Sequence, residues 1–169
     1  QGEMTRDEGG RPARLIGTAQ DVTGRIAGEI ERKAMQRRFH DLFEYAPDAT
    51  VIVDPSGRIT LANREAEMLF GYSREELIGL QVDKLMPQAD KLAHAKSRQQ
   101  YFLNPASRTM GAAQTDLRAR RKDGTTLPVD ISLNPLRSDE GMLVVATVRD
   151  ISARLEAEER RKVLEAQLR

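Results

Sequence analysis

Polar and apolar residues follow two different periods along this chain. Every second residue is apolar between positions 127 and 133, which is typical of a strand with one buried face. A helical spacing of apolar residues runs instead from Val22 to about Tyr45 and stops before Pro47. A second helical pattern, dense in opposite charges, begins at Ser152. We therefore expect a β-rich centre with a helix on each side of it.

Two turn signals divide the centre into hairpins. Thr50–Val53 and Arg58–Ala62 are short apolar runs joined by the sequence DPSG, whose proline and glycine favour a turn. The pair Asp123-Gly124 is the hinge of a second hairpin. The last strand, Met142–Arg149, carries apolar residues on both faces, so a helix from another part of the chain or from a partner is expected to pack on the outer face of the sheet.

Helices are predicted between the two hairpins. Asn63 can cap a short helix over Arg64–Phe70, and Ser73 with Glu76 forms a capping box for the next one. A longer helix is expected from about Ala89 to Leu103. Strands joined by hairpins, together with these helices, indicate an α+β fold with an antiparallel sheet and helices on one of its sides.

Composition narrows the classes of function. The 27 Lys and Arg residues nearly balance the 26 Asp and Glu residues, and a net charge of +1 gives no reason to expect nucleic acid or an anionic membrane as partner. The absence of cysteine excludes disulfides and thiolate chemistry. The longest apolar run, MLVVA, is far shorter than the roughly 20 residues that span a membrane. The 169-residue chain opens on Gln1 rather than on an initiator Met and shows no signal peptide, so we expect a piece of a longer cytoplasmic protein. Residues 1–12 are polar and Gly-rich, so we expect a loose start.

The order of these motifs resembles that of a PAS domain, from about Met35 to Ser152. The stretch LFEYAPDATVIVDPSGRITLANREAEMLFGYSREELIG resembles the first half of such domains, and RRKDGTTLPVDISLNPL followed by ATVRDIS resembles the second half. The resemblance implies a five-stranded antiparallel sheet of order 2-1-5-4-3, helices over its inner face and a pocket between them. It also implies a sensory and dimerising module rather than an enzyme.

The junction at the end of this region occurs twice in the chain. GTAQDVTGRIAGE at residues 17–29 returns as ATVRDISARLEAE at residues 146–158, although two strand-to-helix junctions can also be similar by chance. We therefore expect residues 1–23 to be the end of a preceding PAS domain and residues 24–45 to be a linker helix. Residues 46–152 then form the PAS domain, and residues 153–169 form a C-terminal coiled-coil signalling helix.

Signal relay is expected at the two junctions. Asp150 and Ser152 can satisfy free amides in the first turn of the last helix, and Asp150 lies four residues before Arg154, close enough to pair with it. Asp21 and Thr23 occupy the matching positions upstream. The alternative is that these residues only cap a helix.

Apolar residues are the candidates for a pocket and for a parallel homodimer. The residues expected to line the pocket, or else to fill the core, are Leu61, Leu69, Phe70, Leu85, Met86, Leu92, Ile131, Leu133 and Val145. The residues expected in the dimeric coiled coil are Ile26, Ile30, Leu155, Leu164 and Leu168.

His94 is the candidate cofactor ligand. The stretch from Met86 to His94 resembles oxygen-sensing haem PAS domains, in which a histidine at this place is the proximal iron ligand. The arginine that such domains place on the next strand is missing, because Ala113, Gln114 and Thr115 occupy that region. A surface histidine is the alternative. No catalytic residue, no metal cluster and no cofactor other than haem is identified.

We therefore expect a non-catalytic sensory and dimerisation module of a bacterial-type signalling protein. It would relay a signal through its flanking helices to a downstream effector, first a histidine kinase and second a diguanylate cyclase. The expected partners are a second copy, neighbouring domains of the same chain and a small-molecule ligand, without nucleic acid or membrane. Two alternatives remain: a haem-binding gas or redox sensor with His94 as proximal ligand, and a ligand-free structural dimerisation scaffold.

Overall fold

The computed structural model describes residues 2–6, 9, 12–17, 23–87, 91–111, 116–139 and 141–168, which fall into two compact units, 1–40 and 41–169. The first unit contains an antiparallel hairpin of β1 (Gly2–Arg6) and β2 (Pro12–Gly17), followed by most of α1 (Thr23–Glu44). The expected loose start is wrong over Gly2–Arg6, because pairing with β2 orders a stretch whose own sequence has no strand pattern.

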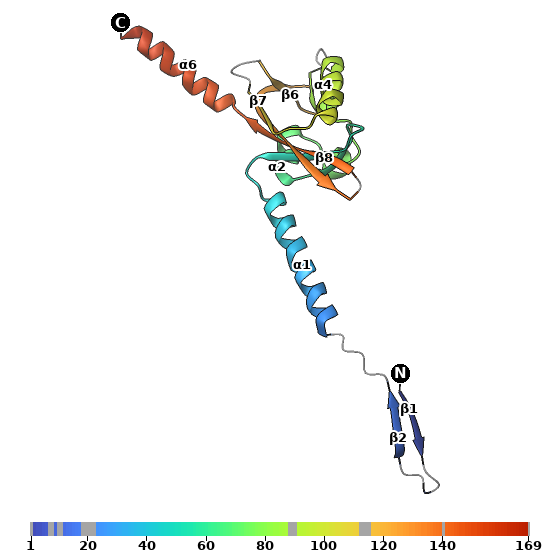
Figure 1. Ribbon diagram of the computed structural model, residues 1–169. Coiled ribbons are helices and arrows are strands. Elements are labelled where there is room, and N and C mark those ends of the chain that lie inside the picture. The colour runs from blue at the N-terminus through green and yellow to red at the C-terminus, as the bar shows by residue number, and fades with distance from the viewer. Residues whose placement is uncertain are drawn as a thin grey trace. The chain divides into compact units, whose positions relative to one another are not determined.

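The second unit is built on an antiparallel sheet (Figure 1). Its strands are β3 (Ala49–Val53), β4 (Ile59–Ala62), β5 (Arg108–Gly111), β6 (Arg118–Arg120), β7 (Thr126–Ser138) and β8 (Gly141–Asp150). They lie in the order β4-β3-β8-β7-β5, and β6 also pairs with β7. The predicted α+β fold and antiparallel sheet are confirmed, with β8 at the centre.

One edge of the sheet differs from the prediction. A single third strand was expected beside β7, but two short strands share that edge: β5 pairs with residues 130–133 of β7 and β6 with residues 126–128. The sequence RTMG of β5 is too short to show a strand period, so this element was missed.

The helices of this unit begin and end close to the predicted positions. They are α2 (Arg64–Phe70), α3 (Arg74–Leu77), the 3₁₀ helix η1 (Val82–Leu85), α4 (Lys91–Leu103) and α6 (Ser152–Gln167). The side chain of Asn63 caps α2 by accepting from the amide of Ala66, and Ser73 with Glu76 makes the predicted capping box of α3.

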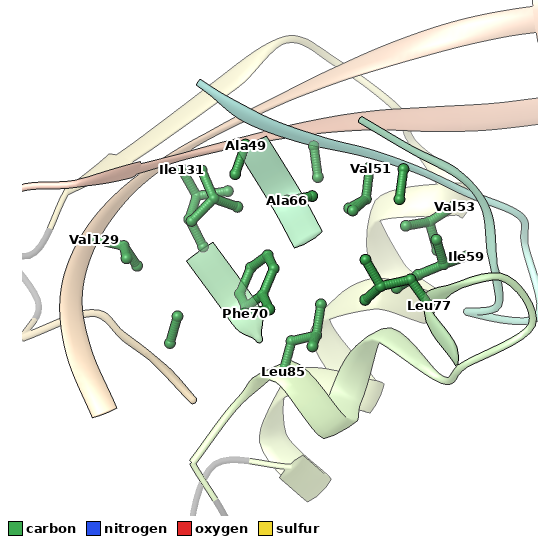
Figure 2. Packing of buried hydrophobic residues seen from close by; sticks show 14 of the residues in the cluster. Ala49, Val51, Val53, Ile59, Ala66, Phe70, Leu77, Leu85, Val129 and Ile131 are labelled. Atoms are coloured by element: carbon green, nitrogen blue, oxygen red, sulfur yellow. The ribbon is translucent and has the colours of Figure 1, made fainter. Parts of the chain in front are cut away.

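The apolar core lies between one face of the sheet and the short helices. Figure 2 shows Val51, Val129 and Ile131 of the sheet on one side of the core, with Phe70 of α2 and Leu77 of α3 in the same cluster. The largest side chains that are fully buried are Phe70, Ile59, Leu77, Val51, Val129 and Asn63. The packing fixes α2 and α3 against the sheet, and Phe70 of α2 also lines the site described next.

Candidate functional site

A cavity of about 580 Å³ lies between α4 and the inner face of the sheet. This volume falls in the range of small-molecule pockets. The sheet contributes apolar side chains that alternate along β3, β7 and β8: Val51, Val53, Ile131, Leu133, Val144, Ala146 and Val148.

The opposite wall is more polar and comes mainly from α4. One face of this helix points to the cavity, through residues spaced by three or four: His94, Ser97, Arg98, Tyr101 and Phe102. The strands β5 and β6 add Arg108, Met110, Arg118 and Ala119. The site therefore combines an apolar floor with several polar and cationic side chains.

Five of the nine residues expected in the pocket do line it: Phe70, Leu85, Met86, Ile131 and Leu133. The prediction is wrong for Leu61, which is 44% exposed on an edge strand, whereas Leu69 packs against the core cluster, the alternative expected for these residues. It is also wrong for Val145, because Val144 and Ala146 face the cavity and successive residues of a strand point to opposite sides. The side chain of Leu92 lies outside the described residues.

His94 takes part in a polar cluster at the cavity wall. Its Nδ1 lies 2.5 Å from Oδ1 of Asp83 in η1, and Nη2 of Arg98 donates to Oδ2 of the same carboxylate at 3.1 Å. Nη1 of Arg98 also reaches the carbonyl oxygen of Pro55, at 3.4 Å, in the β3–β4 turn. The cluster thus ties α4 to η1 and to the hairpin turn, and His94 is held in place rather than freely solvated.

The residues around His94 are compatible with a haem ligand. A histidine that binds a metal through one ring nitrogen usually has its other nitrogen held by a carboxylate, which is the arrangement of His94 with Asp83. Arg108 and Arg118 line the same cavity and are suited to the two carboxylates of the porphyrin edge. Residues 113–115, where haem PAS domains would have an arginine and this chain has none, lie outside the described residues.

The junction between β8 and α6 is held by polar contacts. Oδ1 of Asp150 accepts from the amide of Ser152 at 2.9 Å and from its hydroxyl at 2.6 Å. Arg154 does not pair with Asp150 as expected, because Asp130 on β7 accepts from its Nη1 at 3.1 Å. The first turn of α6 is thereby fixed to both β8 and β7.

The upstream junction is described only in part. Asp21 lies outside the described residues, and Thr23 is the exposed first residue of α1. The role of Asp21 and Thr23 in signal relay therefore stays a prediction.

Two ion pairs that sequence reasoning missed fasten the end of α1 and the segment after it. Arg74 of α3 donates to Glu44 at 2.6 Å, and this bond is the main cause that raises the pKa of the Arg74 guanidinium. Arg149 of β8 donates to Asp48 at 2.6 Å and lowers the pKa of that carboxyl. Arg149 is followed directly by Asp150, so the incoming segment and the outgoing helix are both bound to the end of β8.

Both flanking helices expose apolar side chains. Leu164 of α6 and Leu168, which directly follows this helix, are 60% and 88% exposed, and Ile26 and Ile30 of α1 are exposed as well. Leu155 is half-buried at the start of α6. Nine residues, or two and a half turns, separate Leu155 from Leu164, so these two lie on opposite sides and not on one stripe.

A family model described as PAS domain matches residues 47–153. The chain belongs to the PAS domain family. Two structures support the fold: the PAS domain of an HTR-like protein from Haloarcula marismortui has a TM-score of 0.61 at 23% identity, covering 74% of this chain and 98% of that one. The PAS domain of a Colwellia psychrerythraea protein has a TM-score of 0.60 at 25% identity, covering 70% and 98%.

Three of the curated relatives are named as sensor proteins or as a histidine kinase. The sensor protein FixL of Bradyrhizobium diazoefficiens is 28% identical over 165 residues, which are 98% of this chain and 32% of FixL. The oxygen sensor protein DosP of Escherichia coli is 27% identical over 114 residues, 68% of this chain and 14% of DosP. The cell-division control histidine kinase PdhS of Brucella ovis is 38% identical over 56 residues, 31% of this chain and 5% of PdhS. The chain thus spans about a third or less of these relatives.

The PAS domain itself is a non-catalytic sensory module. Within the described residues, no cluster of three or more His, Asp or Glu side chains is placed to hold a metal ion. None of the helices in that part of the chain has the length and apolar character needed to cross a membrane.

Proposed function

We propose that this PAS domain senses a ligand in its cavity and relays the signal through β8 to α6. The observation that carries this proposal is that the same strand, β8, lines the cavity and leads into α6. Val144, Ala146 and Val148 of β8 line the cavity, and the same strand continues through Asp150 into α6. A displacement of the inner face by a ligand would therefore act directly on the start of the helix.

The contacts at the junction determine how a shift of β8 would reach α6. Asp150 fixes the first turn to β8, while Arg154 is bound to Asp130 on β7. A small slide of β8 against β7 would change the direction in which α6 leaves the sheet, because its two attachments lie on different strands. The helix would carry this change to the effector, for which we propose a histidine kinase first and a diguanylate cyclase second.

We further propose a parallel homodimer formed by the flanking helices. Leu164 of α6 and Leu168 at its C-terminal end are four residues, or about one turn, apart and strongly exposed, as a helix-to-helix contact requires. The chain has no cysteine, so single-cysteine variants at these positions can be cross-linked without background.

The dimer is tested by comparing three such variants. Leu164→Cys and Leu168→Cys are expected to give cross-linked dimers, and Lys162→Cys, on the opposite side of α6, is the control. A monomer at high micromolar concentration, or equal cross-linking at all three positions, would contradict the parallel dimer.

We also propose that residues 1–23 are the end of a preceding PAS domain. The first unit supports this, because β1 and β2 form an antiparallel hairpin that leads to α1, as β7 and β8 form one that leads to α6. The matching sequence at the two junctions extends the likeness. The domain is then one link in a chain of sensory modules.

A haem-dependent sensor is the second candidate function, and the bond between His94 and Asp83 favours it. Haem, when bound, would supply an iron that takes up a diatomic gas or changes its oxidation state. His94 would hold it through the other ring nitrogen, and Asp83 would fix the ring. After addition of hemin, a Soret band that is lost in His94→Ala would support this candidate, and protein that stays colourless would remove it.

A ligand-free scaffold is less well supported. It requires the protein's own Leu and Met side chains to fill the space under α4, whereas a cavity of about 580 Å³ remains between them.

A further inference from the structure

The residues that line the cavity include more cationic than anionic side chains. Arg98 from α4, Arg108 from β5 and Arg118 from β6 bring three guanidinium groups to its wall. Asp116 is the one carboxylate among the described residues that line it. The floor made by the sheet is apolar, so cationic groups and an apolar surface face the same space.

Arg98 and Arg118 already have partners within the protein. Arg118 donates to the hydroxyl and the carbonyl oxygen of Thr126, at 3.2 and 3.4 Å, both of which are uncharged. Arg98 is bound to Asp83, but its Nε is buried and has no acceptor among the described residues. Buried donors are nearly always satisfied in folded proteins, so this group calls for an acceptor.

Arg108 lacks an anionic partner in the part of the chain that the structure describes. It lies close enough to α4 to affect Tyr101: burial raises the pKa of that phenol, and the charge of Arg108 partly opposes the rise. The Tyr101 hydroxyl itself donates to the carbonyl oxygen of Ala106 at 2.6 Å. Arg108 lines the cavity and is exposed, so it is available for an anion that enters there.

We propose that the ligand of this cavity is a metal-free apolar carboxylate, whose anionic head is bound by Arg108 and whose body lies on the sheet. This inference rests on the proposed sensory function and names the class of molecule sensed. A guanidinium donates two parallel hydrogen bonds that match a carboxylate. A cation would be repelled by the arginines, and a highly polar anion would leave the apolar floor without contacts.

Binding to the delipidated full chain tests the proposal by isothermal titration calorimetry. The probes are decanoate and 2-naphthoate, each paired with a neutral counterpart, decanol and 2-naphthamide. At least one acid is expected to bind about tenfold or more tightly than its neutral counterpart, since hydrogen bonds to charged groups are the strong ones. Arg108→Gln is expected to remove that preference and to leave binding of the neutral probe unchanged.

Arg137→Gln is the matched control, because Arg137 is exposed on β7 and does not line the cavity. Equal affinities of acids and neutral probes, no binding of either acid, or the same loss in both variants would overturn the proposal. Hemin is added as a separate probe. If hemin binds and neither acid does, the metal-free ligand is excluded while the sensory function stands. Failure of cross-linking at Leu164 and Leu168 would instead count against the proposed relay of the signal through α6.

Discussion

The side chain of Asn63 is fully buried and makes three hydrogen bonds. Its Oδ1 accepts from the amides of Thr50 and Ala66, at 2.8 and 3.0 Å, and its Nδ2 donates to the carbonyl oxygen of Asp48 at 3.0 Å. One residue therefore joins the start of β3, the end of β4 and the first turn of α2.

Replacing Asn63 by alanine is expected to destabilise the domain by about 2 kcal/mol or more, because two buried amides lose their acceptor. Urea unfolding measures the change. Asn134→Ala, at an exposed position of β7, is the control and is expected to stay within about 0.5 kcal/mol of the wild type. Equal stabilities of the two variants would contradict the structural role of Asn63.

The pair of Arg149 and Asp48 makes stability depend on pH. The hydrogen bond from Arg149 lowers the pKa of Asp48 below its ordinary value of 3.8, so the folded state favours the charged carboxylate. This contribution is fully present above that ordinary value and is lost as the pH falls through the lowered pKa. Arg149→Gln is therefore expected to reduce stability at pH 6 and to matter progressively less as the pH falls below 3.8.

The same variant is expected to return the pKa of Asp48 toward 3.8, which a carboxyl NMR titration measures directly. Arg64→Gln, at an exposed position of α2, is the control. An unchanged pKa of Asp48 in Arg149→Gln would show that the ion pair is not formed in solution.

These residues show that contacts between near neighbours in the sequence can be predicted, whereas contacts between distant residues cannot. Asn63 was predicted as a helix cap, since a cap depends on residues three positions away. The partner of Arg149 was not predicted, because Asp48 lies 101 positions away and several other carboxylates are equally plausible from sequence.

At the scale of elements, α4 is attached to the β3–β4 turn through the hydrogen bond from Arg98 to the carbonyl oxygen of Pro55, and Gly57 of the same turn lies against the Arg98 side chain. Gly57 has φ of +86°, and a Cβ placed on it would lie 2.4 Å from the Arg98 guanidinium. Gly79 has nearly the same φ, +82°, but open space around it. The two glycines therefore separate the cost of the backbone conformation from the cost of a clash.

Gly57→Ala is expected to destabilise the domain more than Gly79→Ala, because only the former also displaces Arg98 from Asp83. The positive φ alone costs about 1 kcal/mol in each. In a background of Arg98→Ala, the two glycine variants are expected to become alike, as thermal unfolding would measure. A difference that persists without Arg98 would mean that the guanidinium does not hold α4 to the turn.

The elements themselves were largely predictable. Both hairpins, α2 and the capping box of α3 follow from turn residues and caps that lie within a few positions of one another. The strand β5 was not predictable, because four residues show no period and their pairing with β7 depends on a segment far away in the chain. Leu61 and Val145 were misplaced for a related reason: an apolar residue on a strand does not by itself say which face is covered.

At the scale of the whole domain, the resemblance to PAS domains predicted a pocket, but not whether the protein's own side chains fill it or leave it open. The same apolar residues can fill a core or line a cavity, and only the position of α4 decides between the two. The three arginines that line the cavity were not predicted from the sequence either, because Arg98, Arg108 and Arg118 lie on three different elements. Only the folded chain brings their guanidinium groups to one space.

The central claim is that the content of the cavity is transmitted along β8 to α6. Ala146→Met places a larger side chain in the cavity, and Val145→Met changes the neighbouring residue that does not line it. Each can be combined with a spin label on Lys162→Cys, which lies on the side of α6 away from Leu164.

The most direct test is the distance between the two labels of the dimer, measured by double electron–electron resonance. We predict that Ala146→Met shifts this distance by about 2 Å, in the range of helix movements in signalling proteins, and that Val145→Met leaves it as in the unmodified cavity. The same distance distribution in both variants and in the parent chain would contradict transmission from the cavity to α6.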